Sequence, residues 1–304
     1  MRLFYLIYRA IFPCIVLCGM LAFETAQAGN LRVIVSIVPQ KEFVERVGGD
    51  LVDVQVLVPP GREPHVFEPT PRQMANLSKA QIYFTIGAPF EKVLLKKIGP
   101  IFKNLRVIDS SKGIKRLPMA EEEDDHESDD GHGHDSGEPD PHIWLDPILV
   151  KTIAENIREG LSKADPAHSS DFQKNMKAFQ SDLDRVSTRI AKELAPFKGR
   201  KFFVFHPAFG YFGARYGLKQ VAVETGGKEP TARLLARLIE TAKREGAKVI
   251  FVQPQFSQSS ADSVAKAIGG VVIPMDPLAE DYLHNLEEMA AGMEKALKTE
   301  SKRR

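Results

Sequence analysis

The stretch SDFQKNMKAFQSDLDRVSTRIAKEL, residues 170–194, decides how this chain is organised. It is predicted to form one long helix, because Asp165-Pro166 breaks the helix that precedes it. At a rise of 1.5 Å per residue, this stretch would reach roughly 37 Å, which is enough to cross a whole molecule. We therefore predict that this helix joins two separate halves of the protein.

Strands alternate with helices on both sides of the long helix. Before it, strands are predicted at 31–38, 51–58, 81–86 and 105–109, with helices at 39–46, from 70 onward, at 90–98 and at 147–161. After it, strands are predicted at 201–205, 220–223, 249–252 and 271–273, with helices at 230–245, 257–268 and 281–297. Such alternation indicates parallel βαβ units. The predicted fold class is α/β, with two Rossmann-like lobes of mostly parallel sheet, 29–148 and 199–304, joined by a rigid helical connection, 149–198.

Composition and charge exclude some classes of protein. The 304 residues are 43% hydrophobic and 27% charged, which excludes a wholly disordered chain and allows a real core. The net charge of +1 hides an asymmetry, because residues 121–140 hold eleven Asp and Glu and no Lys or Arg. The remainder shows no basic cluster interleaved with aromatic residues, apart from a short SKRR tail. We expect no nucleic-acid partner.

The N-terminus is typical of an export signal over residues 1–28. An apolar run, Ile11–Phe23, precedes the small-x-small pattern Ala26-Gln27-Ala28, so the mature chain is expected to begin at Gly29. The run is too short for a comfortable membrane span, and no other stretch could cross a bilayer. Both cysteines lie inside this segment, which leaves the mature protein without a disulfide or a thiolate metal site. A rival interpretation is lipid attachment at Cys18, against which the bulky Leu17 argues.

Three histidines lie in short, proline-flanked contexts. They are found in PHVFEP (64–69), DPHIWLDP (140–147) and FFVFHPA (202–208). Taken singly, a histidine at the end of a strand is more often a hydrogen-bonded loop residue than a metal ligand. Three neutral imidazoles that converge on one point would nevertheless suit Zn²⁺.

Their positions favour convergence. Ligands of open α/β sheets bind outside the carboxyl ends of the strands. His65 follows the strand at 51–58, His206 follows the strand at 201–205, and Asp276 follows the strand at 271–273, while His142 lies in the connection between the lobes. The flanking prolines would stiffen the loops of His65 and His206. We therefore predict a metal site in a cleft between the lobes.

An acidic tract interrupts the alternation, and we expect residues 119–140 to be disordered. It contains His126, His132 and His134 among its carboxylates. One interpretation is a solvated insertion, which is what most charge runs are. The other is a weak auxiliary metal-binding loop, because imidazole binds Zn²⁺ at neutral pH and carboxylates alone bind it poorly.

With these residues in place, the sequence resembles the exported zinc-binding subunits of bacterial ABC uptake systems, the ZnuA-type receptors. The resemblance covers almost the entire mature chain and rests on an ordered set of landmarks: PHVFEPTPRQ (64–73), DPHIWLDP (140–147), VFHPAFGY (204–211), GKEP (227–230), PQFS (254–257) and DPL (276–278). It implies two lobes bridged by a long helix, with one metal between them.

The resemblance carries over residue by residue. His65, His142 and His206 match the family's three histidine ligands, and manganese-type relatives usually have a carboxylate where His206 stands. Asp276 lies at the position of the fourth, aspartate ligand, a place that water takes in other zinc members. The chain departs from many relatives at Gln253, where Glu often precedes Pro-Gln-Phe, and this leaves one fewer carboxylate near the cleft.

The function implied is that of a periplasmic, monomeric, non-enzymatic solute-binding protein. It would capture Zn²⁺ and deliver it to a membrane permease that works with a cytoplasmic ATPase. Alternatives within the same fold are a receptor for manganese or another divalent metal, a metal-dependent adhesin, or a zinc buffer. A zinc hydrolase is a further alternative, because three His and an open position also suit catalysis. Against it, the chain has no His-Glu-x-x-His motif. The nearest candidate for a general base, Glu68, lies in a turn between Phe67 and Pro69 and is expected to anchor that loop.

Overall fold

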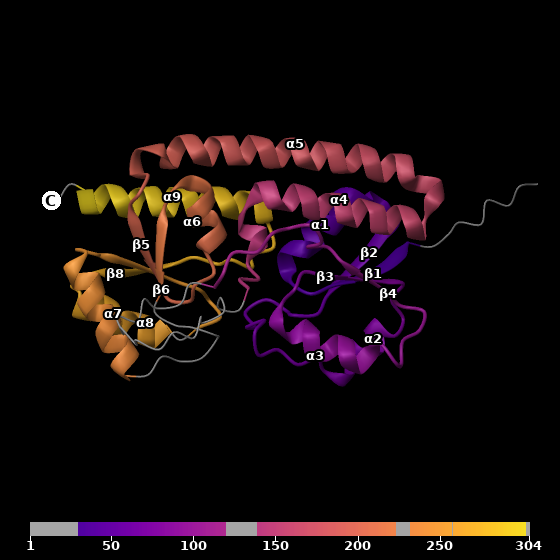
Figure 1. Cartoon of the computed structure of the whole chain (residues 1–304), viewed down its shortest axis with the longest axis horizontal. Helices are drawn as coiled ribbons and strands as arrows, with labels where there is room; N and C mark the ends of the chain where they lie inside the picture. The colour runs from indigo at the N-terminus through magenta and orange to yellow at the C-terminus, as the bar shows by residue number, and fades with distance from the viewer. Residues whose placement is uncertain (1–29, 120–138, 223–231, 257, 302–304) are drawn as a thin grey trace, which may run out of the picture.

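The computed structural model describes residues 30–119, 139–222, 232–256 and 258–301. These residues form two four-stranded parallel sheets, with strand orders β2-β1-β3-β4 and β6-β5-β7-β8. Each sheet belongs to one lobe, and a long helix runs across both (Figure 1). The prediction of two α/β lobes with parallel sheets joined by a long helix is confirmed. The expectations for the signal peptide and for most of the acidic tract concern residues outside those described.

The first lobe surrounds a sheet with helices on both sides (Figure 1). Its β1 is shorter than the predicted strand, because the main-chain N–H groups of Ser36 and Ile37 bond to the side chain of Gln40 at the start of α1. Thr70 caps α2 by accepting a hydrogen bond from the Gln73 N–H, as its position before a proline predicts. The elements of this lobe are β1 (Leu31–Val35), α1 (Val38–Gly48), β2 (Val52–Val56), α2 (Pro71–Leu77), β3 (Ile82–Thr85), α3 (Pro89–Ile98) and β4 (Arg106–Asp109).

Two helices form the connection, α4 (Pro147–Ala164) and α5 (Ser169–Leu194). The carboxylate of Asp146 caps α4, and α5 has 26 residues, about 39 Å at 1.5 Å per residue. Helix α5 buries an apolar stripe with helical spacing: Phe172, Met176, Phe179, Leu183, Val186, Ile190 and Leu194. Helix α5 packs on α4 of the connection, on α1 in the first lobe and on α9 in the second, so one helix supports both lobes.

The second lobe repeats the strand order of the first around β5 (Lys201–Val204). Phe202 and Val204 point into the core shared with the first lobe, whereas Phe203 and Phe205 point to a smaller core beneath α7 and α8. None of the described helices is both long enough and apolar enough to span a bilayer. The other elements of this lobe are α6 (Gly210–Tyr216), β6 (Lys219–Ala222), α7 (Ala232–Arg244), β7 (Val249–Val252), α8 (Gln258–Ala267), β8 (Val271–Pro274) and α9 (Tyr282–Ser301).

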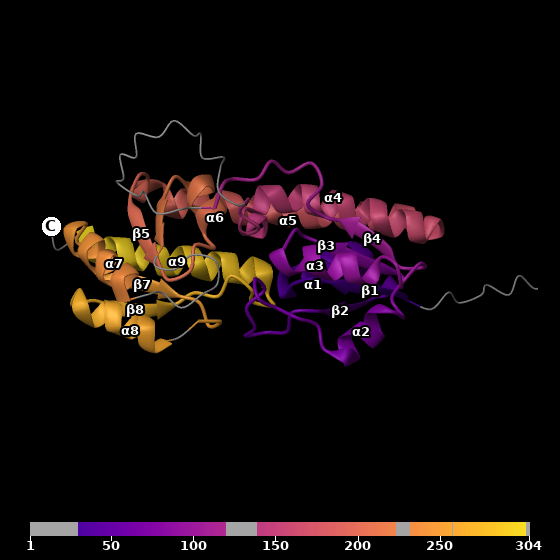
Figure 2. The ribbon, with the colours of Figure 1, turned by 60° about the horizontal axis from the view of Figure 1, so that its bottom comes forward.

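The lobes also meet at the start of α9, which returns from the middle of the molecule toward the C-terminus (Figures 1 and 2). The Tyr282 hydroxyl donates to the main-chain carbonyl of Trp144 at 2.6 Å, and the Trp144 indole N–H donates to the carbonyl of Pro277 at 2.8 Å. The N–H of Tyr282 donates to the Glu42 carboxylate of α1 at 2.6 Å. A carboxylate of the first lobe thus caps a helix of the second.

Candidate metal centre

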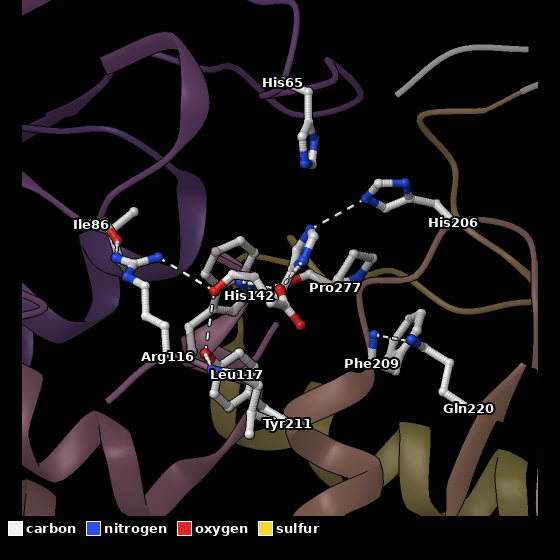
Figure 3. A network of polar contacts seen from close by, with 12 residues as sticks. His65, Ile86, Arg116, Leu117, His142, His206, Phe209, Tyr211, Gln220 and Pro277 are labelled. Carbon is white, nitrogen blue, oxygen red and sulfur yellow. Dashed lines mark hydrogen bonds and ion pairs between the residues drawn. The ribbon is translucent and has the colours of Figure 1, made fainter. Parts of the chain in front are cut away.

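Three histidines from separate segments converge between the lobes (Figure 3). His65 lies in the loop after β2, His142 just before a short 3₁₀ turn (Ile143–Leu145) that leads into α4, and His206 directly after β5. One ring nitrogen of each lies within 4.8 Å of the other two, and among the described residues no further His, Cys, Asp or Glu joins this group. The Nε2 atoms of His142 and His206 are 3.3 Å apart, close to the roughly 3.4 Å expected between two nitrogens on a tetrahedral Zn²⁺.

The Nε2 atom of His65 completes the group of three ring nitrogens. His65 Nε2 is buried and has no hydrogen-bond partner among the described residues. The ring centroid of His65 lies 5.4 Å from that of His142 and 4.9 Å from that of His206. An unpaired buried nitrogen is costly unless a ligand completes it. The geometry is therefore that of a donor set turned toward a common point.

Two of the histidines are held by a carboxylate two residues earlier in the chain. The Asp140 Oδ1 accepts the main-chain N–H of His142 at 2.9 Å and lies 2.7 Å from His142 Nδ1. Glu63 Oε1 repeats the arrangement, accepting the N–H of His65 at 3.0 Å and bonding to His65 Nδ1. A carboxylate on Nδ1 places the proton there, so that the lone pair of Nε2 is left for a metal.

Asp140 is itself held by both lobes (Figure 3). The Arg116 guanidinium donates to the carbonyl of Asp140 at 3.4 Å and to the carbonyl of Ile86 at 2.6 Å, and the Tyr211 hydroxyl donates to the Asp140 carbonyl at 3.2 Å. The guanidinium packs over Gly87, whose φ is 85° and where a Cβ would lie 2.0 Å from an Arg116 nitrogen. Contacts from both lobes therefore hold the main chain of Asp140, the residue whose carboxylate supports His142.

His206 is supported in a different way. Its main-chain N–H donates to Gln253 Oε1 at 3.2 Å, and Gln253 Nε2 donates to its carbonyl at 2.7 Å. Its ring stacks on Phe256, with centroids 4.9 Å apart and an interplanar angle of 21°. An amide from the end of the neighbouring strand β7 thus accepts the main-chain N–H of His206, as a nearby carboxylate does at the other two histidines.

The space between the rings is small and mostly apolar. Its volume is about 20 Å³, which is enough for a single ion or water molecule. Besides the histidines it is lined by residues of both lobes, among them Ala88, Pro89, Trp144, Gln253, Phe256 and Leu278. A site of this size and composition is suited to one desolvated cation.

Burial sets the protonation of the groups in this space. Desolvation lowers the pKa of His142 and outweighs the opposing effect of Asp140, which keeps the imidazole neutral and able to bind metal. Burial would raise the pKa of Glu63, but its hydrogen bond to His65 and the nearby His206 lower that pKa overall. The histidine is therefore neutral and the carboxylate ionised at neutral pH.

Asp276, the expected fourth ligand, does not reach the converging group. Its Oδ1 accepts the side-chain N–H of Gln255 at 2.9 Å and the main-chain N–H of Leu278 at 2.9 Å. It lines a separate open groove of the second lobe, together with Asn285 and Glu288. In this arrangement the fourth position of a metal bound to the three histidines would be open to water. His126, His132 and His134 lie outside the described residues.

The comparisons with known proteins establish the family. The model of a family described as "ZnuA: Zinc-uptake complex component A periplasmic" matches residues 33–296. The chain belongs to this family. The prediction made from the sequence landmarks is confirmed at this level.

Relatives of this family cover most of the chain. The zinc-binding lipoprotein AdcA of Streptococcus pneumoniae is 32% identical over 278 residues, which are 89% of this chain and 55% of the relative. The high-affinity zinc uptake system protein ZnuA of Bacillus subtilis is 32% identical over 256 residues, 80% of this chain and 77% of the relative. A crystal structure of ZnuA is 39% identical, with a TM-score of 0.79 over 88% of this chain and 99% of that one. The chain spans about half the length of the AdcA relative.

Sequence reasoning missed the residues that hold the histidines. Glu63 and Asp140 stand in the same tripeptide pattern, an acidic residue, a proline and a histidine, which occurs at 63–65 and again at 140–142. That repetition is a signal that could have found them. No comparable local signal marks Gln253, which lies 47 residues from His206.

Proposed function

We propose that this protein is the receptor that captures Zn²⁺ for an ABC-type zinc import system. The observation that carries the proposal is the convergence of three imidazole nitrogens from both lobes, two of them with a carboxylate behind the ring. His65, His142 and His206 would be the ligands, and water would take the fourth position. The bound Zn²⁺ is cargo, so the site must both hold it and give it up.

The donor set favours zinc over the other divalent metals. Mg²⁺, Ca²⁺ and Mn²⁺ prefer carboxylate, carbonyl and water oxygens, whereas Zn²⁺ is commonly bound by imidazole in tetrahedral sites. The two outer carboxylates, Glu63 and Asp140, match the two positive charges of the ion in a buried space. A buried charge is tolerated when it is paired in this way.

The placement of the site supports delivery to a partner. Because His65 and His206 come from different lobes, a movement of one lobe relative to the other would dismantle the ligand set and release the ion. We infer that the partners are a membrane permease and its cytoplasmic ATPase, and that the chain acts in the periplasm after its first 28 residues are removed. The description of the family as a periplasmic zinc-uptake component supports both inferences.

Transport in a reconstituted system tests the proposal. Residues 29–304 would be added, loaded with Zn²⁺, to vesicles that contain a zinc ABC permease and its ATPase from the same organism. ATP-dependent zinc uptake should require the receptor and should be lost when all three histidines are replaced by alanine. Absence of uptake with a loaded wild-type protein would contradict the proposal. Hydrolysis of an activated ester by the zinc-loaded protein alone would favour the hydrolase alternative.

A further inference from the structure

Gln253 bonds to both main-chain polar groups of His206. Its Oε1 accepts the N–H at 3.2 Å and its Nε2 donates to the carbonyl at 2.7 Å, where the N–H of Ala208 also donates at 2.8 Å. The side chain is 1% exposed and lines the space between the three histidines. Such a two-point contact fixes both the position and the rotation of the peptide units on either side of His206.

The loop after β5 is held at two places by glutamines from the flanking strands. Because β5 lies between β6 and β7, Gln253 reaches His206 from the end of β7, and Gln220 of β6 reaches the other end of the loop. Gln220 Oε1 accepts the N–H of Phe209 at 2.7 Å (Figure 3). Both bonds anchor the same loop, but only Gln253 contacts the residue that points into the metal site.

We propose that Gln253 is the positioning residue of His206, and that its neutral amide presents this ligand without adding a charge to the site. The inference rests on the proposed function, since it concerns the metal site. Glu63 and Asp140 already bring two negative charges to a space meant for a divalent cation. A carboxylate at position 253 would add a further buried negative charge, and in its ionised form it could not donate to the His206 carbonyl.

The chemistry of the side chain makes the proposal specific. The glutamine amide offers a donor and an acceptor in one plane at this reach, whereas methionine has nearly the same length and volume and makes neither bond. Gln253→Met therefore removes both contacts with little change in packing. Gln220→Met is the matched control, because it removes a glutamine bond to the same loop at a residue that is not a ligand.

Zinc affinity, measured in competition with a chromophoric chelator, is the first test. Gln253→Met should weaken Zn²⁺ binding about 10- to 100-fold, the usual effect of losing a group that orients a metal ligand, while Gln220→Met should change it by less than about threefold. The Co²⁺-loaded protein should show an altered visible absorption spectrum only for Gln253→Met. Equal affinities for Gln253→Met and wild type would overturn the proposal.

A second test separates positioning from a general loss of structure. In a His206→Ala background, zinc binding is weaker, and the further substitution Gln253→Met should then cost no more than about twofold, because the residue it positions is gone. An undiminished effect in that background would show that Gln253 acts elsewhere.

Should Gln253→Met not fold, Gln253→Asn replaces it, because the asparagine side chain is one methylene too short to reach both the N–H and the carbonyl of His206. A wild-type protein without tight zinc binding would instead refute the proposed function.

Discussion

The two lobes share one strand order but hold their histidines differently. In the first lobe, Glu63 supports His65 from two residues away, and Asp140 does the same for His142 where the chain leaves that lobe. In the second lobe, the main chain of His206 is hydrogen-bonded by Gln253, which is 47 residues distant in sequence and is brought close by the pairing of β5 with β7. The carboxylate contacts are local and charged, and the contacts from Gln253 are distant and neutral.

This difference shows how the site divides two requirements. In the proposed site, the carboxylates would raise the basicity of His65 and His142 and would balance part of the charge of the ion. The contacts from Gln253 would fix the backbone of His206 without adding charge. The following experiments test how far this division holds, beginning with the largest expected effect.

Replacing any one of the three histidines should weaken zinc binding severely, whether a carboxylate or the Gln253 amide supports that histidine. We expect His65→Ala, His142→Ala and His206→Ala each to weaken zinc binding by orders of magnitude, because each removes one of the three proposed protein ligands. Isothermal titration and chelator competition would measure this. His284→Ala is the control, since His284 lies exposed on α9 beside Glu288. Wild-type affinity in any of the three variants would remove that residue from the ligand set.

Loss of a local carboxylate should be milder. Asp140→Asn and Glu63→Gln should each reduce zinc affinity about 10- to 100-fold, because the imidazole loses the partner that fixes its tautomer. Asp140→Asn should cost more, since its side chain is 3% exposed against 13% for Glu63. Asp165→Asn, which breaks the similar 2.6 Å contact with His168 away from the site, is the control. An affinity unchanged by both site substitutions would contradict the division into charged and neutral supports.

Glu91 offers a contrast within the first lobe, a buried carboxylate without an imidazole partner. Burial raises its pKa to about 7, while hydrogen bonds from Ser36, Ile86 and Gly87 act in the opposite direction. Between pH 4.5 and 7 the folded state keeps a proton that the unfolded state releases. The stability due to Glu91 is therefore present below pH 4.5 and is lost as the pH rises through 7, by up to about 3 kcal/mol.

The free energy of unfolding of the metal-free protein measures this effect. Urea denaturation of wild type and Glu91→Gln at pH 5 and pH 8 should show wild type losing stability relative to the variant as the pH rises. Glu91→Gln has no ionisable group at position 91, so it serves as the reference against which the pH-dependent loss in wild type is measured. A constant difference between the two proteins across this range would refute the assignment.

Deletion of the acidic tract should have the smallest effect on the tight site. Pro118 and Pro139 form a β-bridge, and the N–H of Asp140 donates to the carbonyl of Leu117 at 2.9 Å, so the ends of the tract already meet. Replacing residues 120–138 by a short glycine linker should change tight zinc affinity by no more than about threefold, since loop length alters closure entropy only slightly. Calorimetry should also show the loss of any weaker sites. Loss of the tight site would make the tract part of the ligand set.

Much of the fold could be predicted from the sequence. The strand–helix alternation and the Asp165-Pro166 break specify local structure, and local structure of this kind implies parallel sheets on either side of a long helix. The end of β1 was predicted too late because Gln40, a residue of the following helix, bonds to the N–H groups that would have extended the strand. Such a side-chain contact leaves no periodic pattern in the sequence.

The site could be predicted only in part, for the same reason. His65 and His206 follow strands and His142 has a landmark motif, so their meeting could be anticipated, and their role as ligands stays a prediction. The position of Asp276 could not be anticipated, because Gln255 and the Leu278 N–H hold its carboxylate away through tertiary contacts. The support from Gln253 likewise depends on strand pairing that no local motif encodes.

Trp144 gives the protein an optical reporter of its own. It is the chain's single tryptophan, it is 2% exposed, and its ring centroid lies 5.2 Å from that of His142. Its hydrogen bonds to Pro277 and Tyr282 also place it on the contact between the lobes. Because indole emission depends on nearby charge and polarity, the intrinsic fluorescence of the unlabelled protein should register both the arrival of the ion and any movement of one lobe against the other.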